Sequence, residues 1–339
     1  MFDFIYIEEE VRDYPRVAAI CDRYPKATRV PIDRYGEVFN RRSQNFRLQK
    51  RRPALILAAK HGDPVLAAPP DYGIGGDRNF YFSHMLNCLY DCRYCFLQGM
   101  YQSAHMVLFV NYAEFAAAID ACIARERATN PDDNPYFFSG YDCDSLAMEA
   151  VSGFAARFLE FFRKRSDAWL ELRTKSVRLD PLQAVTPVPN CIVAFSLTPE
   201  AVARQYEAGA PPIAARLQAM QRLQQQGWNV GLRFDPLIVY EDCRDQYLRL
   251  FGQVFAALDA RRLHSVSLGH FRLTRDHYRR LHQLYPEEPL LAHGLTERDG
   301  MISYPDDLAG ELFESCAREI EKQVGPDRFF ACSPAPELA

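Results

Sequence analysis

Short apolar runs rich in β-branched and aromatic residues alternate with helical patterns along most of this chain, and this alternation constrains the fold most. Six such runs lie at 80–82, 136–138, 170–172, 192–197, 230–234 and 266–268. Apolar residues at helical spacing mark segments between them, at 113–127, 146–164, 213–226 and 247–258. The alternation indicates parallel β/α units, because parallel strands need a crossover connection, which a helix usually supplies.

Six β/α units are too few for a closed eight-fold barrel, so two architectures remain open, a doubly wound open sheet and a partial barrel. A strand is expected at 4–7 and a helix at 15–24, and a helix at 306–323 with a strand at 328–331 ends the pattern. We therefore expect an α/β appendage over 1–75, the β/α region over 76–285 and a C-terminal helix–strand extension over 286–339.

The composition is that of a folded globular protein. The chain has 339 residues, of which 48% are hydrophobic and 25% charged, and this excludes disorder as the main state. No apolar run approaches the roughly 20 residues of a membrane span, and the first residues lack the basic start and apolar core of a secretory signal. We therefore expect a cytoplasmic protein with no membrane partner.

Ten cysteines are many for this length, and three of them lie close together. Cys88, Cys92 and Cys95 follow the first strand of the alternating region, and strand ends carry the active site in parallel β/α folds. Without a secretory signal, metal binding or catalysis is favoured over a disulfide framework. Three thiolates at this spacing can bind one metal centre.

Two kinds of metal centre are compatible with the cysteines. A structural zinc site would need a fourth ligand from elsewhere, such as His84 or Cys143, because no second cysteine pair at zinc-ribbon spacing follows. An iron–sulfur cluster normally takes four thiolates, so three leave one iron open for a substrate or cosubstrate. The [4Fe–4S] cluster is the favoured interpretation, and zinc remains the alternative.

The spacing Cys-x3-Cys-x2-Cys, with Tyr94 before the last cysteine, resembles the signature of the radical S-adenosylmethionine (SAM) superfamily. The resemblance implies a [4Fe–4S] cluster whose open iron binds the amino and carboxylate groups of SAM. It also implies reductive cleavage of SAM to a 5′-deoxyadenosyl radical that abstracts hydrogen. The fold that goes with this signature is a partial (β/α)6 barrel.

A narrower resemblance is to the spore photoproduct lyase family. The segment Cys-Arg-Tyr-Cys-Phe-Leu-Gln at 92–98 is similar to the family's Cys-x-Tyr-Cys-Tyr-Leu-Gln. Shorter matches lie at Tyr6–Glu9, Leu108–Asn111, Arg173–Ser176, Ala194–Leu197, Asp235–Ile238 and Tyr304–Pro305. The resemblance implies a carbon–carbon lyase that repairs a thymine–thymine lesion in DNA: a hydrogen is abstracted, the linking bond breaks and a hydrogen returns to the product radical.

The resemblance also implies roles for single residues. The three clustered cysteines would hold the iron–sulfur cluster. Lys175 and Ser196, at the ends of the third and fourth strands, would contact SAM, and Asp235 joins them as a cofactor-binding residue. A Lys ammonium can pair with a carboxylate, and a Ser hydroxyl can bind a carboxylate or a ribose. A snorkelling surface lysine and an ordinary strand-end serine are the structural alternatives.

Two positions depart from the family. Phe96 stands where the family has a tyrosine after the third cysteine. The family's second-strand cysteine, which donates hydrogen to the product radical, aligns with Tyr141 when Asp144, Glu149 and Gly153 are matched.

Cys143 lies two residues beyond Tyr141 and would share a face with it if the strand continued. We therefore expect Cys143 or Tyr141 to replace the family's donor, with a buried structural thiol as the alternative for Cys143. Tyr94 is a further catalytic candidate, because its ring could stack on the substrate or relay the radical.

DNA binding would need local positive charge, because the net charge is −4. Arg233, near the end of the fifth strand, could face the pocket. The other candidates are Arg41, Arg42, Arg47, Lys50, Arg51, Arg52, Arg272, Arg275, Arg279 and Arg280. For most of these, a solvated surface is the simpler interpretation. The chemistry would also need an electron donor such as ferredoxin or flavodoxin.

Two alternatives to the lyase remain open on the sequence. One is a radical SAM enzyme that acts on a substrate other than DNA. The other is a zinc-stabilised nucleic-acid-binding protein with no catalytic function.

Overall fold

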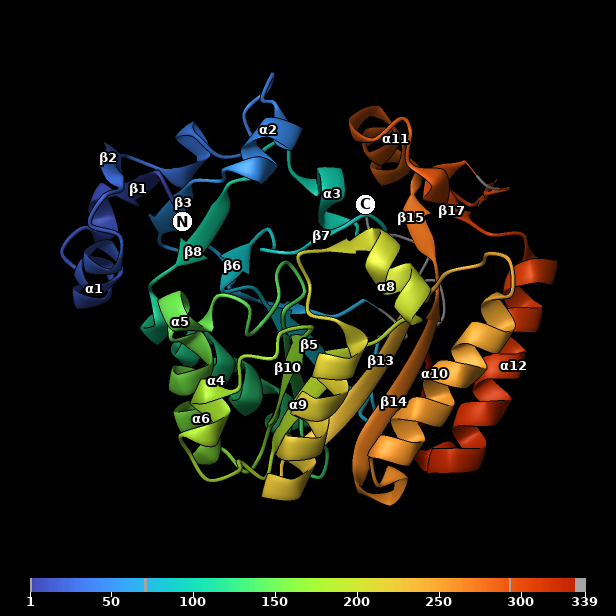
Figure 1. The fold of residues 1–339 in the computed structure, drawn as a ribbon. Coiled ribbons are helices and arrows are strands. Elements are labelled where there is room, and N and C mark those ends of the chain that lie inside the picture. The colour runs from blue at the N-terminus through green and yellow to red at the C-terminus, as the bar shows by residue number, and fades with distance from the viewer. Residues whose placement is uncertain (1, 70–71, 293, 333–339) are drawn as a thin grey trace.

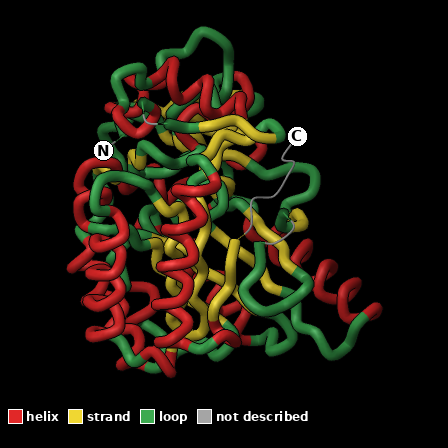
Figure 2. The backbone as a smooth tube through the Cα atoms, turned by 90° about the vertical axis from the view of Figure 1, so that its right-hand side faces the viewer, coloured by secondary structure: helices red, strands yellow, loops and turns green. Residues whose placement is uncertain are grey.

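The computed structural model describes residues 2–69, 72–292 and 294–332, and its main element is an eight-stranded sheet with the order β18-β14-β13-β11-β10-β9-β5-β4 (Figures 1 and 2). Six of its strands are the predicted ones: β5 (Asn79–Phe82), β9 (Tyr136–Ser139), β10 (Trp169–Thr174), β11 (Cys191–Ser196), β13 (Asn229–Leu237) and β14 (Leu263–His270). Neighbours among these six strands pair in parallel.

The order of these six strands follows the order of the chain. In a doubly wound sheet the strand order reverses at a switch point, so later strands are added at the opposite edge. In a barrel each new strand is added next to the preceding one, at the same edge. The strand order therefore decides between the two architectures that the sequence left open, in favour of the partial (β/α)6 barrel.

Helices connect the barrel strands. They are α4 (Tyr112–Thr129), α5 (Glu149–Ser152), α6 (Phe154–Arg163), α7 (Asp180–Gln183), α8 (Glu200–Tyr206), α9 (Ile213–Gln226) and α10 (Cys243–Ala257). The α9 helix has the predicted bounds and ends at Gly227, whose φ of +94° suits a left-handed C-cap. The single helix predicted over 146–164 is wrong, because Gly153 adopts a φ of +56° and separates α5 from α6.

A second, five-stranded sheet lies beside the barrel and has the order β2-β1-β3-β8-β6. Its strands are β1 (Phe4–Glu8), β2 (Thr28–Ile32), β3 (Leu55–Ala58), β6 (Met85–Leu86) and β8 (Met106–Phe109), and α1 (Pro15–Arg23) and α2 (Phe46–Arg51) belong to the same end of the chain. Strands β6 and β8 flank the cysteine segment, so this sheet anchors that segment to the N-terminal part. The boundary at residue 75 between the N-terminal appendage and the β/α region remains a proposal.

One further strand extends the barrel sheet at each edge. The β18 strand (Phe329–Cys332) pairs in parallel with β14, and the short β4 strand (Val65–Ala67) pairs antiparallel with β5 at the other edge. The α12 helix (Asp306–Val324) packs against α10 and β14. A small antiparallel sheet lies above α12 in the view of Figure 1, next to α11 (Arg275–Leu284). Its strands are β15 (Arg272–Thr274), β16 (Thr296–Arg298) and β17 (Met301–Ser303). None of the helices in the described ranges is long and apolar enough to cross a membrane.

Gly140, directly after β9, gives a test of this fold. Its φ is +84°, and an added Cβ would lie 2.6 Å from Ser145 Oγ and 2.9 Å from the Arg173 carbonyl oxygen. We expect Gly140→Ala to lower the free energy of unfolding by about 2 kcal/mol or more, through backbone strain and steric overlap. Denaturant unfolding measures the change.

Gly252 in α10 is the matched control, because an added Cβ there meets nothing within 4 Å. Gly252→Ala should raise the free energy of unfolding by up to about 1 kcal/mol, since alanine favours a helix interior. A Gly140→Ala variant as stable as the natural chain would contradict the described backbone at this turn.

Candidate functional site

A cavity of about 280 Å³ lies at the carboxyl ends of the barrel strands. Strand-end residues form much of its wall, among them Gly140 after β9 and His270 at the end of β14. The nine residues that the sequence predicts for the site all line this cavity: Cys88, Cys92, Tyr94, Cys95, Tyr141, Cys143, Lys175, Ser196 and Asp235. Residues spread over some 150 positions of the chain are thus brought to one place.

The cysteine segment forms a loop over the cavity and contains only short regular elements, β7 (Asp91–Cys92) and α3 (Leu97–Met100). On one side, β7 pairs antiparallel with β12 (Glu207–Ala208), so that Cys92 lies opposite Glu207. The Arg93 amide next to it donates to the Tyr206 carbonyl oxygen at 2.8 Å. The segment after α8 therefore fixes the backbone at the second cysteine.

The N-terminal part holds the same loop from another side. Lys50 of α2 donates from Nζ to the carbonyl oxygens of Cys88 at 2.9 Å and Tyr90 at 3.1 Å. The sequence makes the basic stretch around Lys50 a candidate for phosphate contacts, but this side chain points into the protein and lines the cavity.

The C-terminal part holds the end of the loop. Arg280 of α11 donates to the carbonyl oxygens of Gly99 at 3.2 Å and Met100 at 3.1 Å. Just beyond α11, the Tyr285 hydroxyl donates to Gln98 Oε1 at 3.0 Å. Contacts from three distant parts of the chain therefore fix the cysteine loop.

The three clustered cysteines are free and largely enclosed. Burial raises the pKa of each thiol, that of Cys88 to about 12. A metal centre would therefore have to displace protons on binding, as it does at other thiolate sites.

The spacing of the sulfur atoms distinguishes the two candidate metal centres. Among the described residues, only Glu8, Glu10 and His61 form a group of three potential ligands whose atoms all lie within 4.8 Å of one another. At least one pair of the three cysteine sulfurs is therefore more than 4.8 Å apart, which exceeds the roughly 3.8 Å that a tetrahedral zinc ion with 2.3 Å bonds would require. In a [4Fe–4S] cluster each thiolate binds a different iron, so the donor set fits the cluster better than a single ion.

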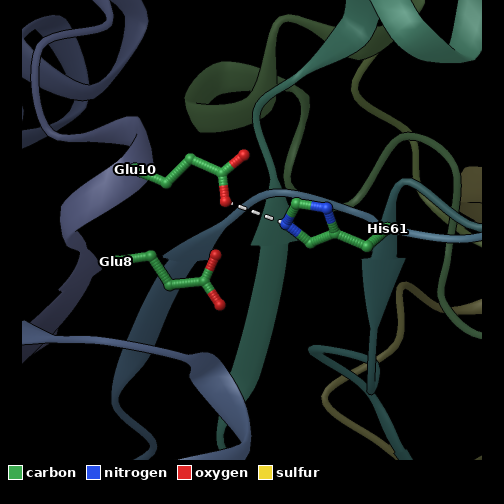
Figure 3. Close-up of side chains that lie close together, drawn as sticks. All are labelled: Glu8, Glu10 and His61. Carbon is green, nitrogen blue, oxygen red and sulfur yellow. Dashed lines mark ion pairs between the residues drawn. The ribbon is translucent and has the colours of Figure 1, made fainter.

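The Glu8, Glu10 and His61 group lies at the end of β1 and lines no part of the cavity (Figure 3). Its ligand atoms already have protein partners. Glu8 accepts from the backbone amides of Tyr35 at 2.6 Å and Ala59 at 2.9 Å. Arg34 lies 3.0 Å from Glu10, which is itself 2.9 Å from His61. These contacts account for the group as a structural cluster.

Sequence reasoning missed a buried carboxylate beside the cysteine loop. Glu207 accepts from the Tyr94 hydroxyl and the Arg216 guanidinium, and its Oε1 lies 3.8 Å from Lys175 Nζ. Burial raises the pKa of Glu207, but Lys175 and Arg216 outweigh it, so the pKa lies below its ordinary value. Burial alone would lower the pKa of Lys175, but the neighbouring Cys92 and Glu207 outweigh it and raise the pKa above its ordinary value, so Lys175 is a cation. The Tyr94 hydroxyl is thus engaged in a hydrogen bond with Glu207, which restricts it as a relay for the radical.

No local pattern identifies Glu207 or Arg216. Glu207 follows a short helix and Arg216 lies in the polar α9 helix, where both would be read as surface charges. Both are buried by tertiary contacts, Glu207 with the cysteine loop and Arg216 with the end of β11.

Asp144 joins the loop after β9 to the end of β10. Its carboxylate accepts from the Leu146 and Ala147 amides at 2.9 and 2.8 Å, from Thr174 Oγ1 at 2.7 Å and from the Lys175 amide at 2.6 Å. These four donors place the segment that carries Tyr141 and Cys143 against the end of β10, directly before Lys175.

The expectation that Tyr141 and Cys143 share a strand face is wrong, because β9 ends at Ser139. Both residues nevertheless line the cavity from the turn that follows. The Tyr141 ring stacks on Tyr81 with centroids 4.5 Å apart. Cys143 Sγ lies 3.9 Å from Nδ1 of the buried His84, which does not itself line the cavity.

The predicted basic residues divide into two groups. Lys50, Arg233 and Arg272 line the cavity and contact protein groups there. The exposed ones are Arg41, Arg42, Arg47, Arg51, Arg52, Arg275, Arg279 and Arg280.

The sequential six-stranded sheet and the cysteine loop at its carboxyl ends define a partial barrel of the radical SAM type. The family model described as Spore photoproduct lyase matches residues 80–299. This chain belongs to the spore photoproduct lyase family.

Curated relatives are similar over part of the chain. The spore photoproduct lyase of Bacillus subtilis is 25% identical over 206 residues, which cover 60% of this chain and 59% of the relative. The spore photoproduct lyase of Clostridium acetobutylicum is 20% identical over 213 residues, 62% of each chain. The match thus spans less than two thirds of these relatives.

Solved structures agree over almost the whole chain. A spore photoproduct lyase mutant with bound AdoMet and dinucleoside spore photoproduct has a TM-score of 0.84 at 18% identity, covering 98% of both chains. Spore photoproduct lyase complexed with dinucleoside spore photoproduct gives a TM-score of 0.81, also at 18% identity and 98% coverage of both chains. These likenesses confirm the expected fold.

His84, the buried neighbour of Cys143, gives a test of the packing behind the site. It is 1% exposed, its ring stacks on Phe154 with centroids 3.6 Å apart, and burial lowers its pKa to about 3. In the unfolded chain the His84 imidazole takes up a proton near pH 6.5, whereas in the folded chain it does so only near pH 3. The free energy of unfolding therefore keeps its full value above pH 6.5 and falls as the pH drops toward 3. We expect a loss of roughly 2 kcal/mol between pH 7 and pH 5 from this group.

Unfolding free energies of His84→Asn and the natural chain, measured across that range, give the comparison. The variant cannot titrate at this position, so its stability should fall less steeply with acid. His282→Asn, at an exposed position of α11, is the control and should keep the natural slope. Equal slopes for His84→Asn and the natural chain would show that His84 is not held neutral.

Proposed function

We propose that this protein is a radical SAM lyase that repairs a thymine dimer of the spore-photoproduct type in DNA. The observation that carries the proposal is the cavity that unites the three cysteines with Lys175 and Ser196. Family membership supports it, as do the names of the relatives and the AdoMet and spore photoproduct bound in the similar structures.

The proposed cofactors are a [4Fe–4S] cluster and SAM. When bound, they supply the one-electron cleavage of SAM that gives a 5′-deoxyadenosyl radical able to abstract hydrogen from the lesion. Cys88, Cys92 and Cys95 would each hold one iron and leave the fourth for the amino and carboxylate groups of SAM. Bound substrate would have to complete the closure of the cavity to keep water and other hydrogen donors from the radical.

Lys175 and Ser196 are proposed to bind SAM. The Lys175 ammonium would pair with the SAM carboxylate. The Ser196 hydroxyl, at the carboxyl end of β11, would donate to the carboxylate or the ribose. Glu207 and Arg216 would act as positioning residues, because Glu207 holds Lys175 and Arg216 donates to the Ser196 carbonyl oxygen at 3.0 Å.

Asp235 is the third proposed cofactor-binding residue. It lies against Gly269, where an added Cβ would come within 2.7 Å of its Oδ1, and 3.5 Å from Arg272. The close approach fixes the carboxylate at the cavity wall, where it could accept hydrogen bonds from hydroxyl groups of a ribose.

Cys143 and Tyr141 are the proposed hydrogen donors to the product radical. Cys143 carries an S–H group that burial keeps protonated, since burial raises the thiol pKa well above its ordinary value. Burial likewise raises the pKa of Tyr141 to about 12, so its phenol keeps the O–H bond. The phenol O–H is the stronger bond, which makes Cys143 the better donor of the two.

The proposed partners are damaged DNA and an electron donor such as ferredoxin or flavodoxin. The exposed arginines around α2 and α11 would contact phosphates. The lesion must leave the base stack to reach the cavity, and unstacking costs least at a damaged step.

Anaerobic turnover tests the proposal. The reconstituted protein should bind about four irons per chain, cleave SAM to 5′-deoxyadenosine under a strong reductant, and restore thymine in an oligonucleotide with a defined spore photoproduct. Cys92→Ala should lose cluster and turnover together. Zinc-loaded protein without iron, or SAM cleavage that restores no thymine, would contradict the proposal.

The hydrogen donor has its own test. Cys143→Ala should lower thymine restoration by about tenfold or more, while lesion-dependent SAM cleavage continues, because only the last step is affected. Tyr141→Phe should have the smaller effect. If the double variant Cys143→Ala, Tyr141→Phe restores thymine at the natural rate, neither residue is the donor.

A further inference from the structure

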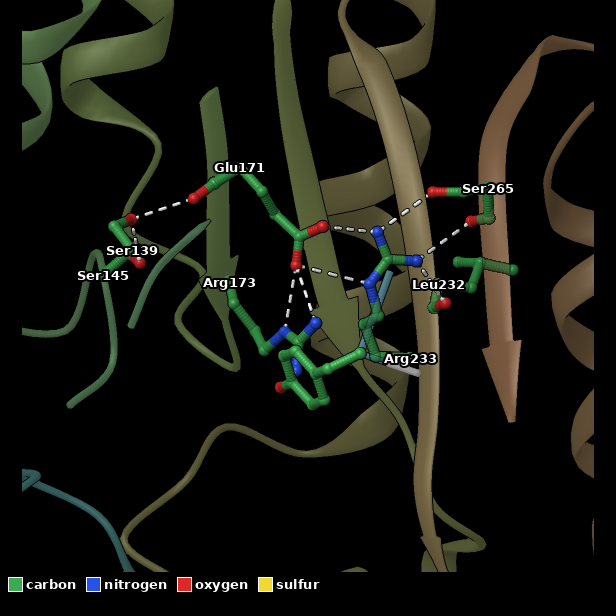
Figure 4. A network of polar contacts seen from close by, with 8 residues as sticks. Ser139, Ser145, Glu171, Arg173, Leu232, Arg233 and Ser265 are labelled. Atoms are coloured by element: carbon green, nitrogen blue, oxygen red, sulfur yellow. Dashed lines mark hydrogen bonds and ion pairs between the residues drawn. The ribbon is translucent and has the colours of Figure 1, made fainter. Parts of the chain in front are cut away.

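Two arginines share one buried glutamate inside the barrel (Figure 4). Glu171 is 0% exposed and projects from β10. Its Oε2 lies 2.6 Å from Arg233 Nη2 of β13, and its Oε1 lies 3.0 Å from both Nε and Nη2 of Arg173. Residues 171 and 173 point to the same face of the strand, as the two-residue period of β structure requires.

Arg233 is fully engaged in this cluster. Besides Glu171, it donates to the Leu232 carbonyl oxygen at 2.8 Å and to Ser265 at both the hydroxyl and the carbonyl oxygen, at 3.0 and 3.2 Å. Arg233 and Glu171 therefore make a buried pair whose charges cancel and whose polar atoms are satisfied.

Arg173 shares Glu171 with Arg233 and, unlike Arg233, keeps unused donors. A guanidinium has five N–H groups, of which the contacts with Glu171 and the Tyr72 hydroxyl use at most three. Arg173 and Tyr72 both line the cavity. Burial and the neighbouring Arg233 lower the pKa of Arg173 to about 10, which still leaves it charged at neutral pH.

The acidic groups nearby do not neutralise the whole cluster. Arg272 pairs with Asp235 at 3.5 Å, so the cluster of Glu171, Arg173, Arg233, Asp235 and Arg272 contains three cations and two anions. An uncompensated charge in an enclosed wall costs stability. A bound anion would compensate this charge and offset its cost.

We propose that Arg173 binds the phosphodiester that links the two nucleotides of the lesion, so that the substrate class is a nucleotide pair with its backbone intact. This inference rests on the proposed function and adds to it the group that the cavity recognises. A planar guanidinium with free N–H groups suits a phosphate, to which it can donate two parallel hydrogen bonds.

The rings beside Arg173 suit the rest of a nucleotide. The Arg173 guanidinium lies 4.9 Å from the centroid of the Tyr72 ring, and Tyr72 packs edge-on against Tyr141 at 6.0 Å. Aromatic faces next to a cation are the usual means of holding bases and backbone together.

The carboxylate of SAM is the other anion that the cavity is proposed to take, and Lys175 is better placed for it. Lys175 Nζ lies 5.6 Å from the centroid of Tyr94 in the cysteine loop, whereas Arg173 adjoins Tyr72 and β13. The two cations therefore serve different ends of the cavity.

Binding of two matched ligands to the reconstituted, SAM-loaded protein tests the proposal. The ligands are a spore photoproduct dinucleotide with the linking phosphate and the dinucleoside without it. The natural protein should bind the dinucleotide about tenfold more tightly, the effect of a charge-assisted contact. Arg173→Gln should remove this preference, and Arg173→Lys should retain part of it.

Arg318→Gln, which removes one exposed charge on α12, is the control and should keep the natural preference. Arg173→Gln should fold with a melting temperature no lower than that of the natural protein, because Glu171 keeps Arg233. Its affinity for SAM should also be unchanged. Retention of the phosphate preference by Arg173→Gln, or a loss of SAM affinity in its place, would overturn the assignment.

Undamaged thymine dinucleotide and free thymidine separate this inference from the proposed function. If the lesion assignment fails, damaged and undamaged ligands bind alike, while dependence on phosphate and Arg173 persists and supports the inference. If the inference fails, the lesion is still preferred, but the linking phosphate makes no difference.

Discussion

The site depends on hydrogen bonds that hold the backbone of the cysteine loop. The loop has only the two residues of β7 and the four of α3 in regular structure, so its shape is not self-supporting. Lys50 holds its first part, the pairing of β7 with β12 holds Cys92, and Arg280 holds its end. These anchors come from the N-terminal part, the β/α region and the C-terminal region, so the positions of the three thiols depend on contacts from all three.

Two buried ionic clusters give the cavity its polarity. On the side of the cysteines, Glu207 balances Arg216 and orients Lys175. On the barrel side, Glu171 balances Arg233 and leaves Arg173 with spare donors. Buried charges seldom add stability, since desolvation offsets the attraction. Their placement at both ends of one cavity is explained if each end receives an anionic group, as proposed for SAM and for the substrate phosphate.

Much of the fold could be predicted from sequence, because the determining signals are local. Each barrel strand is a short apolar run, and α9 ends where Gly227 permits a left-handed residue. The break between α5 and α6 was not predicted, since apolar spacing continues across Gly153 and only its backbone angle interrupts the helix. The strands β3 and β8 were not foreseen as partners, because they pair across a long separation in sequence.

The amino-acid sequence by itself determined the alternating β/α pattern, the three-cysteine spacing and the family resemblance, since each depends on residues close together in the chain. Tertiary structure alone decided which charges are buried together. Glu171, Glu207 and Arg216 look like ordinary polar residues, and Lys50 and Arg173 like any surface cation, until the strand ends converge. The reason is physical: a side chain's charge environment is set by neighbours that are distant in sequence, and no local pattern encodes them.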